Sequence, residues 1–191
     1  MRGSIIFALP LILMGNFSSY AAPGPAHADS AGSGTSFSIE VDPAPFFYRG
    51  YSVAAGYSVG RYRFSANLFS TDYPDFALKE GWHAHVEIAG SIRFQYYFKP
   101  RSEGWYAGIQ IGLLETNYRR DGSSGDVSVT QFALTPTAGY RWFPFAGGFY
   151  LMPAIGVGFT LWASGDATLG GETYPQYAPV FISAVHIGYE F

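Results

Sequence analysis

Apolar and polar residues alternate over most of the chain. The run at residues 180–191 shows this best, because Phe181, Val185, Ile187 and Tyr189 share one face and the residues of the other face are mainly small or polar. A period of two is the spacing of a β-strand, whose successive side chains point to opposite faces. We distinguish eight such runs, at residues 37–41, 51–59, 62–70, 85–98, 105–116, 130–142, 149–162 and 180–191.

The connections between the runs differ in length in a regular order. Those after the even runs are short, at residues 60–61, 99–104 and 144–148. Those after the odd runs are mostly longer, at residues 42–50, 71–83, 121–126 and 163–178. Bacterial barrels have an even number of strands, short periplasmic turns and longer outside loops. The pattern therefore predicts an all-β fold, an eight-stranded antiparallel up-and-down transmembrane β-barrel over residues 37–191, with both termini in the periplasm.

Aromatic residues on the apolar faces fall beside the short connections or the C-terminus. In a membrane barrel such residues form a girdle at one membrane surface, whereas a soluble β-sandwich gives no reason to collect them at one end. The predicted girdle consists of Tyr57, Tyr62, Tyr96, Phe98, Trp105, Tyr140, Trp142, Phe149, Tyr189 and Phe191.

The composition agrees with a membrane barrel and excludes several other classes. Charged residues make up 13% of the chain, against about 25% in soluble domains, while aromatic residues reach 19%. Mean hydropathy is only +0.08, as expected where apolar and polar residues alternate. The absence of cysteine excludes disulfides, thiolate chemistry and a lipoprotein anchor. The net charge is −3 and no basic stripe is present, so we expect no nucleic-acid partner.

The first 28 residues differ from the rest and are expected to be a signal peptide. Arg2 precedes the apolar run at residues 5–14, which is too short to span a bilayer as a helix. Small residues at suitable spacing place cleavage after Ala21 or after Ala28, and the sequence leaves both positions open. Residues 29–36 then form a short segment ahead of the barrel.

The end of the chain, "HIGYEF", resembles the C-terminal signature of outer-membrane proteins. The signature residues are Val185, Ile187, Tyr189 and the terminal Phe191. The resemblance implies recognition by the outer-membrane assembly machinery of a Gram-negative cell envelope, and contact with outer-membrane lipid and lipopolysaccharide. The general likeness is to small, porin-like barrels of the OmpA and OmpX kind.

Eight strands enclose an interior that side chains fill. On the predicted register a polar network occupies this lumen, where acids and guanidinium groups need partners. Its expected members are Glu40, Arg63, Glu87, Arg93, Gln95 and Arg141. We therefore expect a structural or surface-interaction role with no cofactor, and a narrow channel is an alternative.

A second cluster, His83, His85 and Glu87, falls on one strand face near the outer end. Imidazole and carboxylate groups are metal ligands, but same-face neighbours stand about 6.5–7 Å apart, which is awkward for three bonds of ~2 Å. A hydrogen-bonded rim cluster is the preferred interpretation, so no metal is expected.

The catalytic alternative is a lipid A acyl hydrolase or acyltransferase that uses Ser70, Asp72, His83 and His85. Pro136 and Pro153 face lipid on adjacent strands at similar depth, and neither can donate a ladder hydrogen bond. This pair resembles the lateral seam of the lipid A palmitoyltransferase barrel. The resemblance covers the two prolines and not the active site.

The long connections also carry aromatic residues. Phe46, Phe47, Tyr48, Tyr73, Phe76 and Trp82 either pack on the barrel or form a contact surface for an extracellular ligand that the sequence does not identify.

Overall fold

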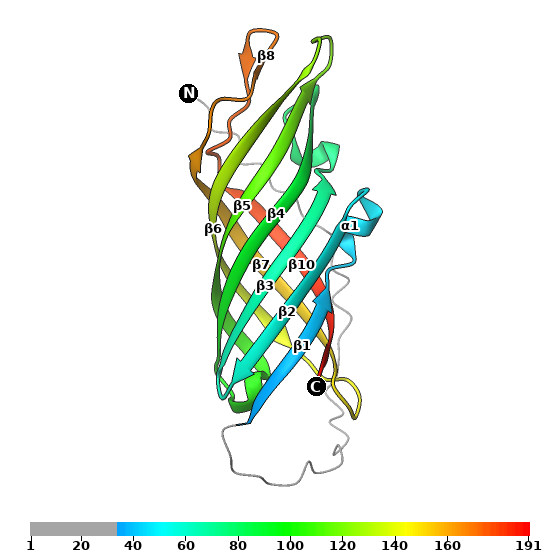
Figure 1. Cartoon of the computed structure of the whole chain (residues 1–191), viewed down its shortest axis with the longest axis vertical. Coiled ribbons are helices and arrows are strands. Elements are labelled where there is room, and N and C mark those ends of the chain that lie inside the picture. Colours follow the sequence, from blue (N-terminus) through cyan, green and yellow to red (C-terminus); the bar gives the residue numbers. More distant parts are fainter. Residues whose placement is uncertain (1–33) are drawn as a thin grey trace.

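The computed structural model describes residues 34–191, which form a closed barrel of eight antiparallel strands (Figure 1). Neighbours around the ring follow the order β1-β10-β7-β6-β5-β4-β3-β2. The predicted fold class is therefore confirmed. The eight strands are β1 (Thr35–Val41), β2 (Tyr51–Val59), β3 (Tyr62–Asp72), β4 (Trp82–Tyr97), β5 (Gly104–Arg120), β6 (Asp126–Arg141), β7 (Phe149–Ala163) and β10 (Val180–Glu190).

The two ends of the barrel differ. One end, here called the turn end, carries the short connections, including the 3₁₀ turn η2 (Pro100–Ser102). The other, the loop end, carries the helix α1 (Ala44–Phe47), the 3₁₀ turn η1 (Asp75–Ala77) and a hairpin of β8 (Thr168–Leu169) and β9 (Glu172–Thr173). Strands β4, β5 and β6 have 16, 17 and 16 residues and extend beyond the shorter strands toward the loop end (Figure 1).

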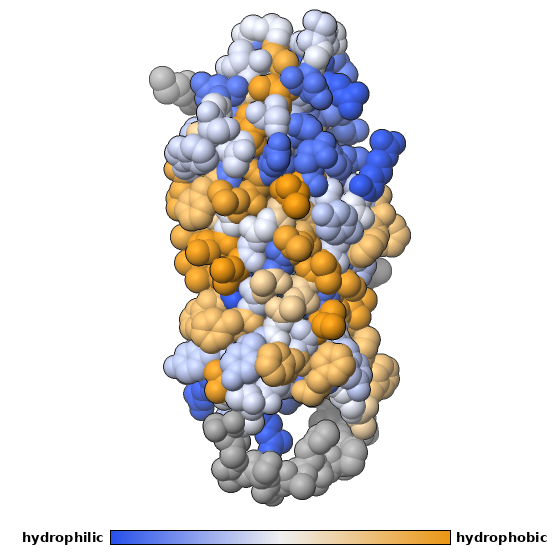
Figure 2. All heavy atoms as spheres, viewed as in Figure 1, coloured by the Kyte–Doolittle hydropathy of each residue, from blue (hydrophilic) through white to orange (hydrophobic). Residues whose placement is uncertain are grey.

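Alternation along the strands separates an apolar outside from a polar inside. On β1 and β3, for example, Ile39, Phe64 and Leu68 are exposed, whereas Glu40 and Arg63 are buried. On the face seen in Figure 2, apolar side chains gather in a band across the middle of the barrel, and most hydrophilic ones lie toward the loop end. Such a division is what a membrane barrel needs, with lipid on one side of the sheet and a polar interior on the other.

A β-bulge on β4 changes the predicted register. The ladder between β3 and β4 shifts between Phe69 and Thr71, and the ladder between β4 and β5 shifts between Val86 and Ile88. A bulge adds one residue, so both Glu87 and Ile88 lie outside, while Val86 and Ala89 are buried inside. The predicted lumenal position of Glu87 is wrong for this reason.

Two of the eight seams between strands are incomplete. Only four pairs join β1 to β10, from Ser38 with Glu190 to Val41 with Ile187. In the seam between β6 and β7, no pairs form at Thr135 and Pro136 or at Tyr140 and Arg141. By contrast, sixteen consecutive pairs join β5 to β6.

The first strand begins at Thr35, two residues before its predicted start. The predicted signal peptide, its cleavage positions and most of the segment 29–36 lie outside the described residues. None of the helices formed by residues 34–191 is long and apolar enough to cross a membrane.

Candidate functional site

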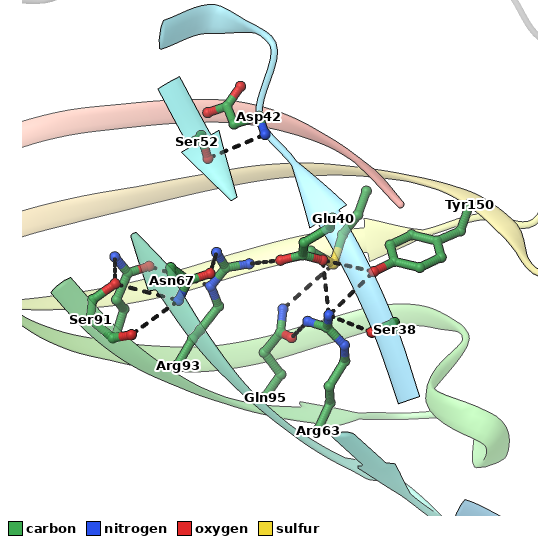
Figure 3. A network of polar contacts seen from close by, with 12 residues as sticks. Ser38, Glu40, Asp42, Ser52, Arg63, Asn67, Ser91, Arg93, Gln95 and Tyr150 are labelled. Atoms are coloured by element: carbon green, nitrogen blue, oxygen red, sulfur yellow. Dashed lines mark hydrogen bonds and ion pairs between the residues drawn. The ribbon is translucent and has the colours of Figure 1, made fainter. Parts of the chain in front are cut away.

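The lumen near the turn end holds one buried carboxylate between two buried guanidinium groups (Figure 3). Arg63 Nη2 donates to Glu40 Oε2 at 2.9 Å, and Arg93 Nη1 approaches Glu40 Oε1 at 3.3 Å. The Tyr150 hydroxyl donates to Glu40 Oε2 at 2.9 Å from β7, the second strand from β1 around the ring. The side chains of Glu40 and Arg63 have no exposed surface, so their charges are neutralised within the protein rather than by water.

Neutral polar groups complete the network around these charges. Arg63 also donates to Gln95 Oε1 at 2.9 Å and to the Ser38 hydroxyl at 3.0 Å. Arg93 donates to Asn67 Oδ1 at 2.9 Å, and a hydrogen bond from Gln110 to Ser91 continues the network toward the loop end. Glu40, Arg63, Arg93 and Gln95 therefore lie together in the lumen, in contrast to Glu87.

Arg141 forms a separate pair nearer the turn end. Its Nη2 is 2.8 Å from Glu190 Oε2, and its guanidinium carbon lies 3.8 Å from the ring centroid of Tyr150 and 4.9 Å from that of Phe143. The aromatic faces supply favourable electrostatics to a buried cation. Together, the two groups of charges and rings cross the lumen at successive levels.

The two histidines of β4 lie on the outer wall near the loop end. His83 lies between two carboxylates, with Nδ1 3.3 Å from Asp75 Oδ1 and Nε2 3.2 Å from Asp121 Oδ1. His85 Nδ1 lies 2.6 Å from Asp72 Oδ1, and its Nε2 lies 3.7 Å from Glu87 Oε2. Within residues 34–191, no three histidine or acidic side chains are grouped so that they could hold a metal ion.

The groups of the catalytic alternative are only partly brought together. Asp72 pairs with His85, but the buried Ser70 hydroxyl donates to the Val86 carbonyl at 2.9 Å. In the described part of the chain no hydrogen bond joins Ser70 to His83 or His85. A nucleophilic serine requires a base within hydrogen-bonding reach, so this arrangement does not form a catalytic triad.

The loop end contains an apolar core of its own, which the sequence did not predict. Inward-facing Trp82, Ala84, Tyr118 and Val129 pack with Leu78 and with Ala167, the residue before β8. Tyr73 and Tyr174 join this cluster, and burial raises the pKa of Tyr73 to about 12. Apolar residues do alternate at residues 82–86 and 127–131, but the predicted strands begin only at residues 85 and 130.

The aromatic residues of the long connections therefore divide into two groups. Trp82 and Tyr73 belong to the apolar core of the loop end, inside the barrel rather than on its rim. Phe47 is 84% exposed and Phe76 67% exposed, so they form an accessible apolar surface.

The residues of the C-terminal signature line the outside of β10. Val185, Tyr189 and Phe191 are exposed, and Ile187 is half-buried. The terminal Phe191 N–H donates to the Phe37 carbonyl at 2.8 Å, which ties the end of the chain to β1.

Pro136 and Pro153 are both exposed on the outer wall and both affect the same seam. The carbonyl of Pro136 lies beside Gly156, and the carbonyl of Pro153 lies beside Gly139. Because the nitrogen and carbonyl of one strand residue point to the same side, both missing N–H groups belong to the ladder between β6 and β7. The interruptions of this ladder occur at the two prolines.

Comparison with protein-family models gives no match, and comparison with curated proteins gives none either. Solved structures that are similar in fold include two outer-membrane proteins. The N-terminal β-barrel domain of Pseudomonas aeruginosa OprF aligns with a TM-score of 0.51 and 14% identity over 82% of this chain and 97% of that domain. A major outer membrane protein from Thermus thermophilus aligns with a TM-score of 0.53 and 15% identity, over 83% of this chain and 100% of that one. The chain thus has the fold of the small eight-stranded outer-membrane β-barrels.

Proposed function

We propose that the chain is an integral protein of a bacterial outer membrane, with a structural and surface-contact role and a lumen closed to solute diffusion. The loop end is extracellular and both termini are periplasmic. Support comes from the apolar band, the short connections at one end and the hydrophilic cover at the other (Figure 2). An apolar outer band, short periplasmic turns and longer extracellular loops are typical of outer-membrane barrels.

The observation that carries the closed lumen is the pairing of Glu40 with Arg63 and Arg93 (Figure 3). An ion that passed would have to displace buried groups that already satisfy one another, which costs several kcal/mol per ion. The apolar core around Trp82 lies across the lumen at the other end. The extracellular surface then remains as the place where the protein meets its surroundings.

Conductance in planar bilayers tests the closed lumen. The reconstituted protein is expected to show no discrete openings in symmetrical salt. The variant Glu40→Ala, which leaves both guanidinium groups without their carboxylate, serves as the comparison for an opened network. Discrete openings of the unmodified protein would support the narrow-channel alternative instead.

Single-cysteine labelling tests the orientation, because the chain has no cysteine of its own. Ser124→Cys lies in the exposed turn between β5 and β6, and Ala146→Cys lies in the exposed connection between β6 and β7. In intact cells a membrane-impermeant maleimide is expected to label residue 124 and to spare residue 146. Labelling of 146 alone would reverse the proposed orientation, and recovery in the soluble fraction would exclude the membrane.

A further inference from the structure

The barrel wall has a side gap above the end of β1. The chain leaves the wall after Val41, where the Asp42 N–H donates to the Ser52 hydroxyl at 3.3 Å and Pro43 follows. Continuing the register would place Pro43 opposite Val185, and proline cannot donate to the ladder. Within residues 34–191, residues 180–186 of β10 have ladder partners on β7 and none on the other side.

The gap opens at the depth of the apolar band. Phe181 and Val185 on the outside of β10 are 41% and 48% exposed, and Val53 on β2 is 43% exposed. These side chains are continuous with the surface that faces hydrocarbon. In the proposed orientation the gap lies in the outer leaflet, because residues 180–186 form the loop-end part of β10.

Behind the gap the lumenal side chains are small, and several of them are threonines. Ile182 points inward, since its Cδ1 lies next to Gly158 on the lumenal face, yet it is 41% exposed. Its neighbours on the lumenal faces of β6, β7 and β10 are small: Ala133, Ala154, Gly156, Thr160 and Ala184. The polar network around Glu40 bounds this space toward the turn end.

A second copy of the chain does not fit this gap. Two barrels in one membrane both direct β10 toward the periplasm, and strands tilt by about 35–45° from the membrane normal. Facing β10 edges would therefore cross at roughly twice that angle, which does not allow a ladder. Alanine, glycine, isoleucine and threonine side chains line the space, and their methyl groups gain little from contact with water.

We propose that an acyl chain of an outer-leaflet lipid enters through the gap and lies in the outer half of the lumen against Ile182. Packing of the methylene groups of the acyl chain against Ile182 and the methyl groups around it removes apolar surface from water, which is favourable. An ester or amide carbonyl of the lipid accepts from the N–H groups of β10 that have no ladder partner within residues 34–191, which hydrocarbon alone would leave without partners. The proposal rests on the proposed membrane location.

Photocrosslinking tests the site in the full barrel. The probe is phosphatidylethanolamine with a diazirine in one acyl chain, incorporated into vesicles of phosphatidylethanolamine and phosphatidylglycerol, with adducts mapped by mass spectrometry. We expect adducts on inward residues 182 and 184 as well as on outward residues 181 and 185. Adducts on outward residues alone would overturn the acyl-chain site, whereas their absence from both faces would overturn the membrane location itself.

Two matched variants make the outcome specific. Ala184→Trp fills the space from inside, and Val185→Trp adds the same group outside. We expect lumenal adducts to fall to background in the first and to persist in the second, with folding of both checked by heat-modifiable gel mobility. Should Ala184→Trp not fold, Ile182→Asn is expected to reduce lumenal adducts roughly tenfold, in line with the loss of one apolar contact. Unchanged adducts in the folded variant would contradict the proposal.

Discussion

At the scale of single residues, Glu40 is the group on which most of the lumen depends. It accepts from Arg63 and Tyr150 and pairs with Arg93, all of them deeply buried. Replacing it with glutamine leaves two guanidinium charges without a counterion. We predict that Glu40→Gln destabilises the barrel by about 3–5 kcal/mol, the usual cost of removing one partner of a buried pair. Urea unfolding in phospholipid vesicles, followed by tryptophan fluorescence, measures this change.

Glu115→Gln is the matched control for that measurement. Glu115 is exposed on β5, and its carboxylate accepts a hydrogen bond from the Ser128 hydroxyl at 3.2 Å. Its replacement is expected to alter stability by no more than about 0.5 kcal/mol. Equal losses in the two variants would show that the effect does not come from the buried network.

Glu172 gives the loop end a dependence on pH. Hydrogen bonding by Lys79 (2.7 Å), together with Arg120 (2.6 Å), lowers the pKa of this carboxyl below its ordinary value of 4.5. A lowered pKa means that the carboxylate stabilises the fold above the ordinary value, and that this stabilisation is lost as the pH falls through the lowered one. We predict faster amide exchange in the β8–β9 hairpin below about pH 4, after correction for the intrinsic exchange rate.

Glu172→Gln provides the control, because an amide does not titrate. The corrected exchange of its hairpin is expected to be already fast at pH 6 and nearly constant with pH. An acid-dependent increase of the same size in this variant would assign the effect to another group.

At the scale of elements, the sequence predicted which segments are strands but not how far they extend. Strand β5 ends at Arg120 rather than at residue 116, and β4 begins at Trp82 rather than at residue 85. These ends lie beyond the apolar band, where polar residues such as His83 and Arg119 replace the outward apolar ones. The alternation of outward apolar residues stops there although the hydrogen-bonded ladder continues, so the pattern alone made both strands too short.

The residues of the candidate site could be predicted wherever inward and outward side chains alternate without interruption along a strand. Glu40, Arg63 and Arg93 precede or lie clear of the bulge on β4, and their inward direction follows from period two. Glu87 lies at the bulge, where an added residue reverses the phase, and no glycine or proline marks it in the sequence. Which side chains pair across the lumen also depends on the register of non-neighbouring strands, which the pattern does not specify.

The prolines of β6 and β7 give a prediction that belongs to this scale. Pro136→Ala and Pro153→Ala each supply an N–H to an interrupted ladder, worth about 1 kcal/mol net. Losing proline also loosens the unfolded chain, at a cost of about 0.4–1 kcal/mol. Pro144→Ala, in a turn, carries that second effect alone. We expect both strand variants to be more stable than this control in urea unfolding, and no difference would mean that the seam is not weakened by the prolines.

At the scale of the whole molecule, the wall is held unevenly around its circumference. Long ladders join β4, β5 and β6, with one bulge between β4 and β5, whereas β7 and β10 form a panel with one interrupted and one short seam. Free energies of local opening follow the hydrogen bonds that must be broken. We predict that amides of β7 and β10 exchange faster than those of β5, measured by mass spectrometry on the protein in vesicles. Uniform exchange around the ring would contradict this division.

The four pairs between β1 and β10 also bear on how the cylinder comes into existence. The most distant of these pairs, Ser38 and Glu190, is 152 residues apart in the sequence (190 − 38). Bringing two such positions together in a flexible chain carries an entropic penalty of roughly 4–5 kcal/mol. The hydrogen bonds of four residue pairs cannot offset that entropic penalty until the other strands have paired. We therefore expect the pairing of β1 with β10 to be the final step of folding. The protein would then enter the bilayer as a curved, open sheet.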